Sequence, residues 1–357
     1  MNKRESPVLP EAFDFIPELE GDFQLKPILN DAGRFTRAEL YIPSNEGVLV
    51  VNADITEISN WGAENGVELE NVIGRLIKSV SSPSISFAGL SLDHPILMGV
   101  LNITPDSFHD GGRFSNHDLA IAHALKLLNS GAEILDIGGE STRPGADPIS
   151  EQEEIDRIAP VIEGLADEKA LISVDTRRAG VMRAALSLGA KIINDVNALS
   201  DIGAIEAVKK ANASAILVHM QGIPKSMQQS PNYFDAPYEI ANFLSKKVSL
   251  CERAGIPRDR LAIDPGIGFG KSDDHNLAIL NALPILHGVG VPIVIGVSRK
   301  SFIGRLTGTG KTIDRLAGTI SATLYAMSQG VQIHRVHDVP EIKQALTIWE
   351  RIKCGLN

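Results

Sequence analysis

Four side chains able to bind a flat heterocycle follow four short apolar runs of this sequence. They comprise two carboxylates, one amide and one ammonium group: Asp175, Asn194, Asp264 and Lys300. A carboxylate can accept two parallel N–H bonds from an amino-pyrimidine edge, as it does from arginine. A site built on such bonds rejects a ligand that lacks them by as much as ~10⁴-fold. Either aspartate alone could equally cap a helix, so it is the combination that indicates a heterocycle site.

A second group of side chains is suited to an anion. It consists of Asn102, Arg299, Arg335 and His337. Arginine binds phosphate through two parallel hydrogen bonds, and an asparagine oxygen suits Mg²⁺, which combines few protein oxygens with substrate phosphate and water. No cluster of histidine and cysteine argues for zinc. His219 is expected to be mainly structural, and His334 should point to the opposite face of its strand from His337.

The elements that must position these groups alternate regularly from Pro95 onward, each apolar run being followed by a stretch with helical periodicity. Eight such units over roughly 260 residues predict a (β/α)₈ TIM barrel, whose active sites lie at the C-terminal ends of the strands. An open doubly wound sheet is the alternative, because alternation alone does not close a barrel. The predicted strands are Ile96–Leu101, Ile134–Ile137, Leu171–Val174, Lys191–Asn194, Ala215–Val218, Leu261–Ile263, Pro292–Gly296 and Gln332–Val336.

Residues 1–90 lack this alternation and predict a small N-terminal α/β extension, ahead of a catalytic barrel over residues 91–357. Val48–Val51 reads as a short strand, and Asp54–Val80 as one or two helices broken near Gly62 and Gly66. The serine-rich stretch from Ser79 to Ser86 is typical of a linker. Nothing in the extension carries recognisable chemistry.

Composition excludes several classes of protein. The net charge is −10, and residues 1–90 hold 7 Lys and Arg against 14 Asp and Glu, so no basic surface for a nucleic acid is expected. No apolar stretch reaches the length of a membrane helix, and the N-terminus lacks the apolar core of a secretory signal. Two cysteines without ligand spacing predict reduced thiols in a cytoplasmic protein.

From Pro95 to the end, the sequence resembles the dihydropteroate synthases of the folate pathway. The matching segments occur in the family's order and span roughly three quarters of the chain. They are LNITPDSFHDGG, GGESTRPGA, SVDT, IIND, HMQG with PKSMQ, DPGIGFGK, GVSRKS and RVHDV.

The resemblance implies a barrel enzyme, usually a homodimer, that joins 6-hydroxymethyl-7,8-dihydropterin pyrophosphate to 4-aminobenzoate. The products are 7,8-dihydropteroate and pyrophosphate, and the cofactor is Mg²⁺. The pterin-binding set corresponds to Asp175, Asn194, Asp264 and Lys300, with Met220 packing on the ring. The pyrophosphate and Mg²⁺ set corresponds to Asn102, Arg335 and His337. The mobile-loop and aminobenzoate set corresponds to Phe108, Thr142, Arg143, Pro144, Phe269, Lys300 and Ser301.

The mechanism that we expect is dissociative. The C–O bond to pyrophosphate breaks first, with Mg²⁺, Arg335 and His337 neutralising the leaving charge. Asp175 can stabilise the pterin cation that the arylamine then attacks. No nucleophile paired with a base is visible in the sequence, and this route needs none. The segment DPGIGFGK has no insertion after Phe269, so sulfonamide sensitivity is expected.

Two other functions remain open on the sequence alone. A related pterin-binding barrel that moves a methyl group from methyltetrahydrofolate to a corrinoid protein would keep Asp175, Asn194 and Asp264. It would not need the Thr-Arg-Pro segment, SRKS or the RVHD group. A catalytically silent pterin-binding module is the third possibility, and it would have no use for Arg335 and His337.

Overall fold

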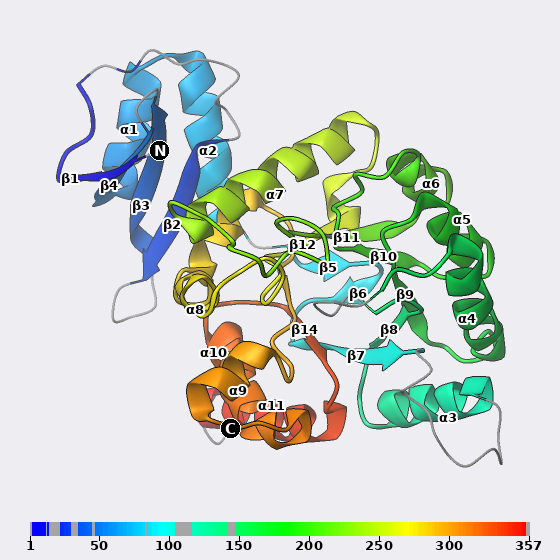
Figure 1. Cartoon of the computed structure of the whole chain (residues 1–357). Helices are drawn as coiled ribbons and strands as arrows, with labels where there is room; N and C mark the ends of the chain where they lie inside the picture. The colour runs from blue at the N-terminus through cyan, green and yellow to red at the C-terminus, as the bar shows by residue number, and fades with distance from the viewer. Residues whose placement is uncertain are drawn as a thin grey trace.

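The computed structural model describes residues 2–11, 13, 22–29, 35–44, 47–82, 84–103, 116–141 and 147–354. Within them an eight-stranded parallel sheet is surrounded by helices, and a smaller unit with its own sheet lies beside it (Figure 1). None of the described helices has the length and apolar character needed to cross a bilayer.

The eight-stranded sheet follows the order β12-β11-β10-β9-β8-β7-β14-β13. A parallel bridge between Ile263 and Ile293 joins its two outer strands and closes it into a barrel. The predicted (β/α)₈ fold is therefore confirmed, and the open-sheet alternative is wrong. The strands are β7 (Ile96–Asn102), β8 (Ile134–Gly138), β9 (Leu171–Asp175), β10 (Ile192–Asp195), β11 (Ser214–Val218), β12 (Leu261–Asp264), β13 (Val294–Ile295) and β14 (Ile333–Val336).

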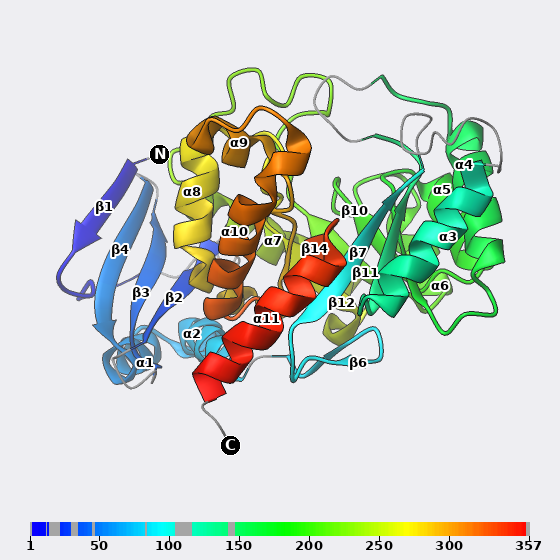
Figure 2. The ribbon, with the colours of Figure 1, turned by 90° about the horizontal axis from the view of Figure 1, so that it is seen from below.

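Helices cover the outside of the barrel, and Figure 2 shows α11 beside β7. Among the described residues of the barrel, three 3₁₀ segments are added to the regular alternation: η2 (Arg258–Arg260), η3 (Leu283–Val289) and η4 (Thr312–Arg315). The barrel helices are α3 (Asn116–Asn129), α4 (Glu151–Gly164), α5 (Ala179–Ser187), α6 (Ala204–Lys210), α7 (Ala236–Arg253), α8 (Asp273–Asn281), α9 (Ser301–Thr307), α10 (Leu316–Ser328) and α11 (Val339–Cys354).

The lower half of the barrel interior is apolar. A hairpin of β5 (Ser86–Phe87) and β6 (Leu90–Ser91) precedes β7 and places the buried Phe87 against the inward-facing side chains of the strands. Because side chains alternate along a strand, every second residue contributes. We call this cluster the interior core; it consists of Phe87, Ile96, Met98, Ile134, Ile192, Val196, Ile216, Val218, Ala262, Val294 and Ile333.

The described residues between 2 and 81 form the N-terminal unit, a four-stranded sheet packed on two helices. The sheet order is β1-β4-β3-β2, with β1 parallel to β4 and the other pairs antiparallel. The strands are β1 (Asn2–Ser6), β2 (Gln24–Leu29), β3 (Phe35–Ser44) and β4 (Gly47–Asp54), and the helices are α1 (Ile55–Glu64) and α2 (Val67–Ser81).

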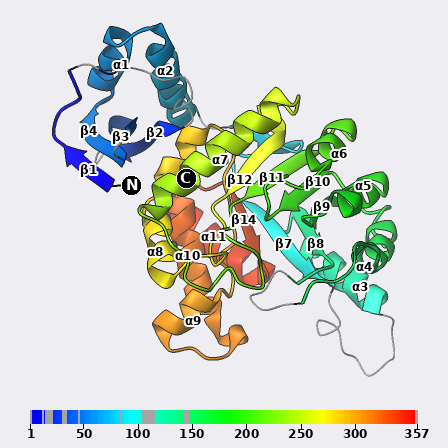
Figure 3. The same cartoon turned by 45° about the horizontal axis from the view of Figure 1, so that its top comes forward.

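The two faces of this sheet serve different partners. Leu40 and Ile42 of β3 pack on α1 and α2. Tyr41, between them, and Val48 and Val50 of β4 belong instead to the large apolar cluster outside the barrel strands. The N-terminal unit and the barrel therefore share one hydrophobic core, along η3 and α7, and Figure 3 shows the unit beside α7 and α8.

Two local expectations were wrong. The stretch read as a linker is shorter, because α2 continues to Ser81 and Ser86 already begins β5. The helices also break only at Asn65 and Gly66, and not at Gly62. Gly62 lies inside α1, where a Cβ would come within 3.1 Å of Ile73, so its small size allows α1 and α2 to approach closely.

Candidate functional site

The predicted site residues come from the inner face of the barrel, one layer above the interior core. On each of four strands an apolar residue of that core is followed, two positions later, by a polar side chain that faces the same way. The pairs are Ile134 and Asp136, Ile192 and Asn194, Ala262 and Asp264, and Ile333 and Arg335. The C-terminal ends of the strands thus form a polar mouth, as the fold predicts.

Asp136, in the middle of β8, binds two of these side chains, Asn194 and Arg335, and a serine of the neighbouring strand β9. It is fully buried and accepts hydrogen bonds from Ser173 Oγ at 2.7 Å, Asn194 Nδ2 at 3.1 Å and Arg335 Nε at 2.6 Å. A buried carboxylate needs such partners, because removing a charge from water is costly. Asp136 is absent from the set predicted from the sequence, although a single charge inside an apolar strand is the signal that could have identified it.

Arg335 also donates to Asp175 Oδ2 at 2.9 Å, so its guanidinium lies between two carboxylates. The remaining oxygens, Asp175 Oδ1 and Asn194 Oδ1, are buried and accept no hydrogen bond within the described part of the chain. Burial raises the pKa of Asp175 to about 7; Arg335 opposes the rise and Asp136 adds to it. Since buried acceptors normally have partners, these two oxygens point to donors on a ligand.

Asp264 and Lys300 face this group from the other side of the mouth. Asp264 Oδ1 accepts from Gly266 N at 2.6 Å, and burial raises the pKa of this carboxyl. Lys300 Nζ lies 4.0 Å from the centroid of the Phe269 ring, a cation–π contact. Burial and the charge of Arg335 lower the pKa of Lys300 to about 8. Phe269 and Met220 are half-buried at the top of the interior core.

A buried lysine, Lys271, fixes the loop that carries Phe269. Lys271 is 1% exposed, and its ammonium contacts the carbonyls of Phe269 at 2.9 Å and His219 at 3.2 Å. It also lies 2.9 Å from His219 Nδ1. Burial lowers the pKa of both side chains well below their usual values. His219 is therefore structural, as expected, and the role of Lys271 was not predicted.

The predicted anion group is only partly assembled. Arg299 forms a bidentate ion pair with Asp338, Nε lying 2.8 Å from Oδ2, and its left-handed φ of 56° directs the chain into this turn.

His337 Nδ1 lies 3.0 Å from Ser298 Oγ. Burial, followed by Arg335 and Arg299, lowers the pKa of His337 to about 3. The ring is therefore neutral at physiological pH, and it brings a hydrogen bond and not a charge. His334 is buried in β14, and because side chains alternate along a strand it lies on the opposite face from Arg335 and His337.

Asn102 ends β7 at the rim of the mouth, next to Asp175. A Cβ on Gly138 would lie 3.5 Å from Asn102 Oδ1 and 3.7 Å from Asp175 Cβ. Gly138 and Gly296 add no side chain to this layer, which leaves room above Asp136. The described residues contain no group of three or more His, Cys, Asp or Glu arranged to hold a metal. One amide oxygen beside space for phosphate oxygens and water fits the ligand preference of Mg²⁺.

Four predicted residues, Phe108, Thr142, Arg143 and Pro144, lie outside the described residues, as does most of the expected lid after β7. Ser301 begins α9 and is exposed.

Glu140 is a further residue missing from the prediction, and it fixes the chain on both sides of residues 142–146. Its buried carboxylate accepts from Arg177 Nε at 3.1 Å, Arg178 Nη2 at 2.7 Å and Ile149 N at 3.2 Å.

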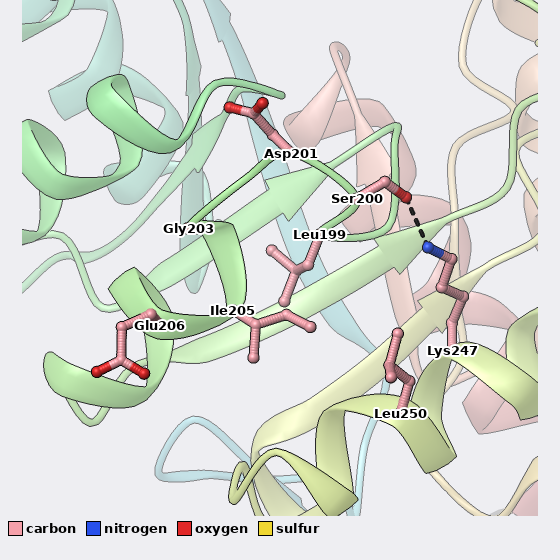
Figure 4. A pocket seen from close by; sticks show the side chains of 8 residues that line it. All are labelled: Leu199, Ser200, Asp201, Gly203, Ile205, Glu206, Lys247 and Leu250. Atoms are coloured by element: carbon pink, nitrogen blue, oxygen red, sulfur yellow. Dashed lines mark hydrogen bonds between the residues drawn. The ribbon is translucent and has the colours of Figure 1, made fainter.

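A separate hollow of about 480 Å³ lies behind the end of β10, between α6 and α7 (Figure 4). The Lys247 ammonium crosses it to Ser200 Oγ at 2.6 Å. None of its lining residues belongs to the mouth, so it is distinct from the site described above.

Comparisons with known proteins agree with this geometry. The family model of pterin binding enzymes matches residues 98–337. The dihydropteroate synthase of Neisseria meningitidis serogroup B is 48% identical over 273 residues, 75% of this chain and 96% of that protein.

Solved structures extend the similarity to the fold. The Xanthomonas albilineans dihydropteroate synthase with 4-aminobenzoic acid is 45% identical, with a TM-score of 0.71 over 75% of this chain and 96% of that one. The Yersinia pestis enzyme in a sulfonamide complex is 45% identical, with a TM-score of 0.70 over 75% and 98%. The N-terminal unit lies outside the match to the family model. The chain from β7 onward carries the family's fold and motifs in order, and the protein belongs to the dihydropteroate synthase family.

Proposed function

We propose that this protein condenses 6-hydroxymethyl-7,8-dihydropterin pyrophosphate with 4-aminobenzoate, forming 7,8-dihydropteroate and pyrophosphate in the synthesis of tetrahydrofolate. The observation that carries the proposal is a pair of buried acceptors, Asp175 Oδ1 and Asn194 Oδ1, for which the described residues supply no donor. An amino-pyrimidine edge supplies N–H donors of the required kind, and Asp264 adds a third acceptor on the opposite side. Met220 and Phe269 offer apolar surface for the ring at the top of the interior core.

The pyrophosphate is expected to leave toward Arg335, His337 and Asn102. Mg²⁺, held by Asn102 and phosphate oxygens, would neutralise part of the leaving charge. Arg335 supplies a permanent positive charge, and the neutral His337 supplies a hydrogen bond. The C–O bond breaks with its electron pair going to pyrophosphate, and Asp175 stabilises the pterin cation that remains. The arylamine nitrogen then bonds to the exocyclic carbon and gives up one proton.

The aminobenzoate is expected on the side of Lys300 and Phe269. The 4.0 Å contact between them places a positive charge beside an aromatic face, which suits an aromatic carboxylate. Ser301 and the predicted residues Phe108, Thr142, Arg143 and Pro144 complete this part of the proposal.

Pyrophosphate release, measured with and without 4-aminobenzoate, tests the proposed reaction. We expect stoichiometric pyrophosphate and dihydropteroate when both substrates and Mg²⁺ are present, and loss of turnover with a chelator. A chain that binds the pterin and releases no pyrophosphate would be the silent module. Methyl transfer from methyltetrahydrofolate to a corrinoid protein would identify the methyltransferase.

Sulfonamides should compete with 4-aminobenzoate, because Phe269 and Gly270 are contiguous and the aminobenzoate side carries no insertion. Raising the aminobenzoate concentration should reverse the inhibition. Unchanged turnover at a large excess of sulfonamide over aminobenzoate would contradict this expectation.

A homodimer in the cytoplasm is the proposed state of the protein. Apolar side chains that are exposed on α10 and α11, such as Tyr325 at 40% and Ile352 at 75%, support a subunit contact there. The buried thiol of Cys251, which forms no disulfide, supports a reducing compartment. Light scattering of the purified protein and fractionation of cells test the two statements.

A further inference from the structure

The N-terminal unit contacts the barrel at the residue where α7 begins. Lys3 Nζ lies 2.8 Å from Asp235 Oδ2, and the other oxygen of Asp235 accepts from Tyr238 N at 3.0 Å as the N-cap of α7. Tyr41 stacks on Tyr238 with ring centroids 5.6 Å apart and planes 9° from parallel. Lys3 also lies over the Tyr41 ring, 5.4 Å from its centroid. These residues form one compact contact between β1, β3 and the start of α7.

A cleft of about 620 Å³ separates the two units beside this contact, and Lys3, Tyr41, Tyr233 and Asp235 are among its lining residues. The broad apolar packing of the N-terminal unit lies elsewhere, on η3 and along α7. Beside the cleft, Lys3 and Tyr41 bring the N-terminal sheet into contact with the first residues of α7.

Tyr233, two residues before the N-cap, connects this contact to the active site. Its hydroxyl donates to the Gly270 carbonyl at 2.9 Å, and its ring packs on His219 and His275, with centroids 6.0 and 4.9 Å away. Gly270 belongs to the β12–α8 loop, residues 265–272, which carries Phe269 and follows Asp264.

Two further contacts tie that loop to the segment between β11 and α7. Gln228 Nε2 donates to the Gly268 carbonyl at 2.6 Å. Gly270 has a φ of 61°, and a Cβ there would come within 2.3 Å of the Gln221 carbonyl oxygen, so the two backbones touch. Movement of the segment before α7 would therefore displace the loop that holds Phe269 against Lys300.

We propose that the N-terminal unit is a brace for the β12–α8 loop, in which Lys3 and Tyr41 fix Asp235 and the start of α7, and Tyr233 carries that constraint to Gly270. Lys3, Asp235 and Tyr233 are accordingly positioning residues for the aminobenzoate side of the site. The expected effect on the KM for 4-aminobenzoate rests on the proposed function. The expected effect on the β12–α8 loop rests on the contacts alone.

Three conservative variants of the full-length protein test the brace. Tyr233→Phe removes only the hydroxyl bonded to Gly270. Asp235→Asn keeps a good N-cap and, like Lys3→Met, removes the ion pair between the units. The matched control is Arg37→Met, which breaks an ion pair of the same kind within the N-terminal sheet, with Asp54 at 3.4 Å. Hydrogen exchange of the peptide covering residues 264–271 and the KM for 4-aminobenzoate are measured on each.

Tyr233→Phe should raise the KM for 4-aminobenzoate about fivefold, the effect of one hydrogen bond, with little change in kcat. Lys3→Met and Asp235→Asn should each raise it about twofold, and the double variant no further, because both remove the same pair. All three should speed exchange in residues 264–271, and Arg37→Met should change neither quantity.

The brace would be overturned if Lys3→Met and Asp235→Asn had the same KM for 4-aminobenzoate and the same hydrogen exchange in residues 264–271 as the wild type. This holds even if Tyr233→Phe alone had an effect. Should the wild-type protein release no pyrophosphate, the proposed function would fail. The exchange measurement would still decide whether the N-terminal unit constrains the loop.

Discussion

The bottom and the mouth of the barrel are built by the same eight strands and differ in chemistry. At the bottom, Phe87 and the inward-facing isoleucines of β7, β8, β10 and β14 exclude water with apolar contacts alone. Two residues further along, the mouth buries Asp136 and Asp264 and half-buries Arg335. Burying charged groups costs free energy that ion pairs only partly recover, whereas apolar burial is directly stabilising.

The difference shows how one scaffold separates stability from function. The bottom needs no partner, but the mouth retains two buried acceptors that receive no hydrogen bond from the part of the chain that the structure describes. A ligand that satisfies them stabilises the folded protein in proportion to its concentration and affinity. The mouth is therefore incomplete by itself in a way that the bottom is not.

The largest expected effect is on stability, from Phe87→Ala. Removing a buried phenylalanine should lower the free energy of unfolding by about 3–5 kcal/mol, while the kcat of the folded protein stays close to that of the wild type. Urea denaturation and turnover at low temperature measure the two quantities. A large fall in kcat alongside the loss of stability would mean that the bottom of the barrel also determines activity at the mouth.

Arg335→Ala should have the opposite profile. We expect kcat to fall on the order of 10²-fold or more, because the charge that receives the leaving group is lost. Arg299→Ala is the control, since its guanidinium is bound to Asp338 at the rim, and its effect should be far smaller. Near-normal turnover of Arg335→Ala would remove this residue from the leaving-group role.

The pH dependence of kcat/KM should report the mouth and not the bottom. The pKa of Asp175 is raised to about 7, so its ionised form is lost, and activity falls, as the pH drops below that value. The pKa of Lys300 is lowered to about 8, so its charge is lost above that pH. A bell-shaped profile with limbs near these values is expected, and Asp175→Asn should abolish the acid limb. Both limbs should appear between about pH 6 and about pH 9. A profile that stays flat over this range would contradict the assignment of the limbs to Asp175 and Lys300.

The smallest expected effect is a difference between two histidines, His337 at the mouth and His94 at the bottom, in how their pKa responds to pyrophosphate. Binding of pyrophosphate should raise the pKa of His337 from about 3 by about 1 to 3 pH units, because a nearby anion favours the charged ring. His94, before β7 at the bottom, is bonded to Asp93 and Glu133, and its pKa should not change. NMR titration of both rings, with and without pyrophosphate, checks the contrast.

Much of the barrel could be predicted, because each strand–helix unit leaves a local pattern. All eight strands were found, although the seventh shrinks from Pro292–Gly296 to Val294–Ile295. The N-terminal sheet was largely missed, since β1 pairs with β4 more than 40 residues away and such pairing leaves no local trace. Polar residues at strand ends located the mouth, because alternation fixes which side chains face inward.

What could not be predicted depends on contacts between distant segments. Asp136 acts through Ser173, Asn194 and Arg335, which lie on three other strands. Arg299 was expected to face phosphate, and its left-handed backbone instead directs it to Asp338. Residue type suggested an anion-binding role for Arg299, and only the fold showed its partner; for Asp136 the fold showed both the role and the partners.

The core that the two units share also bears on how the chain is made. Tyr238 donates to the carbonyl of Asp22, 216 residues earlier in the chain. At the usual speed of translation the first sheet leaves the ribosome on the order of ten seconds or more before that partner exists. Throughout this interval Tyr41, Val48 and Val50 have no barrel to cover them. A nascent chain of this protein therefore presents a strand surface that a chaperone would recognise, until α7 and η3 are synthesised.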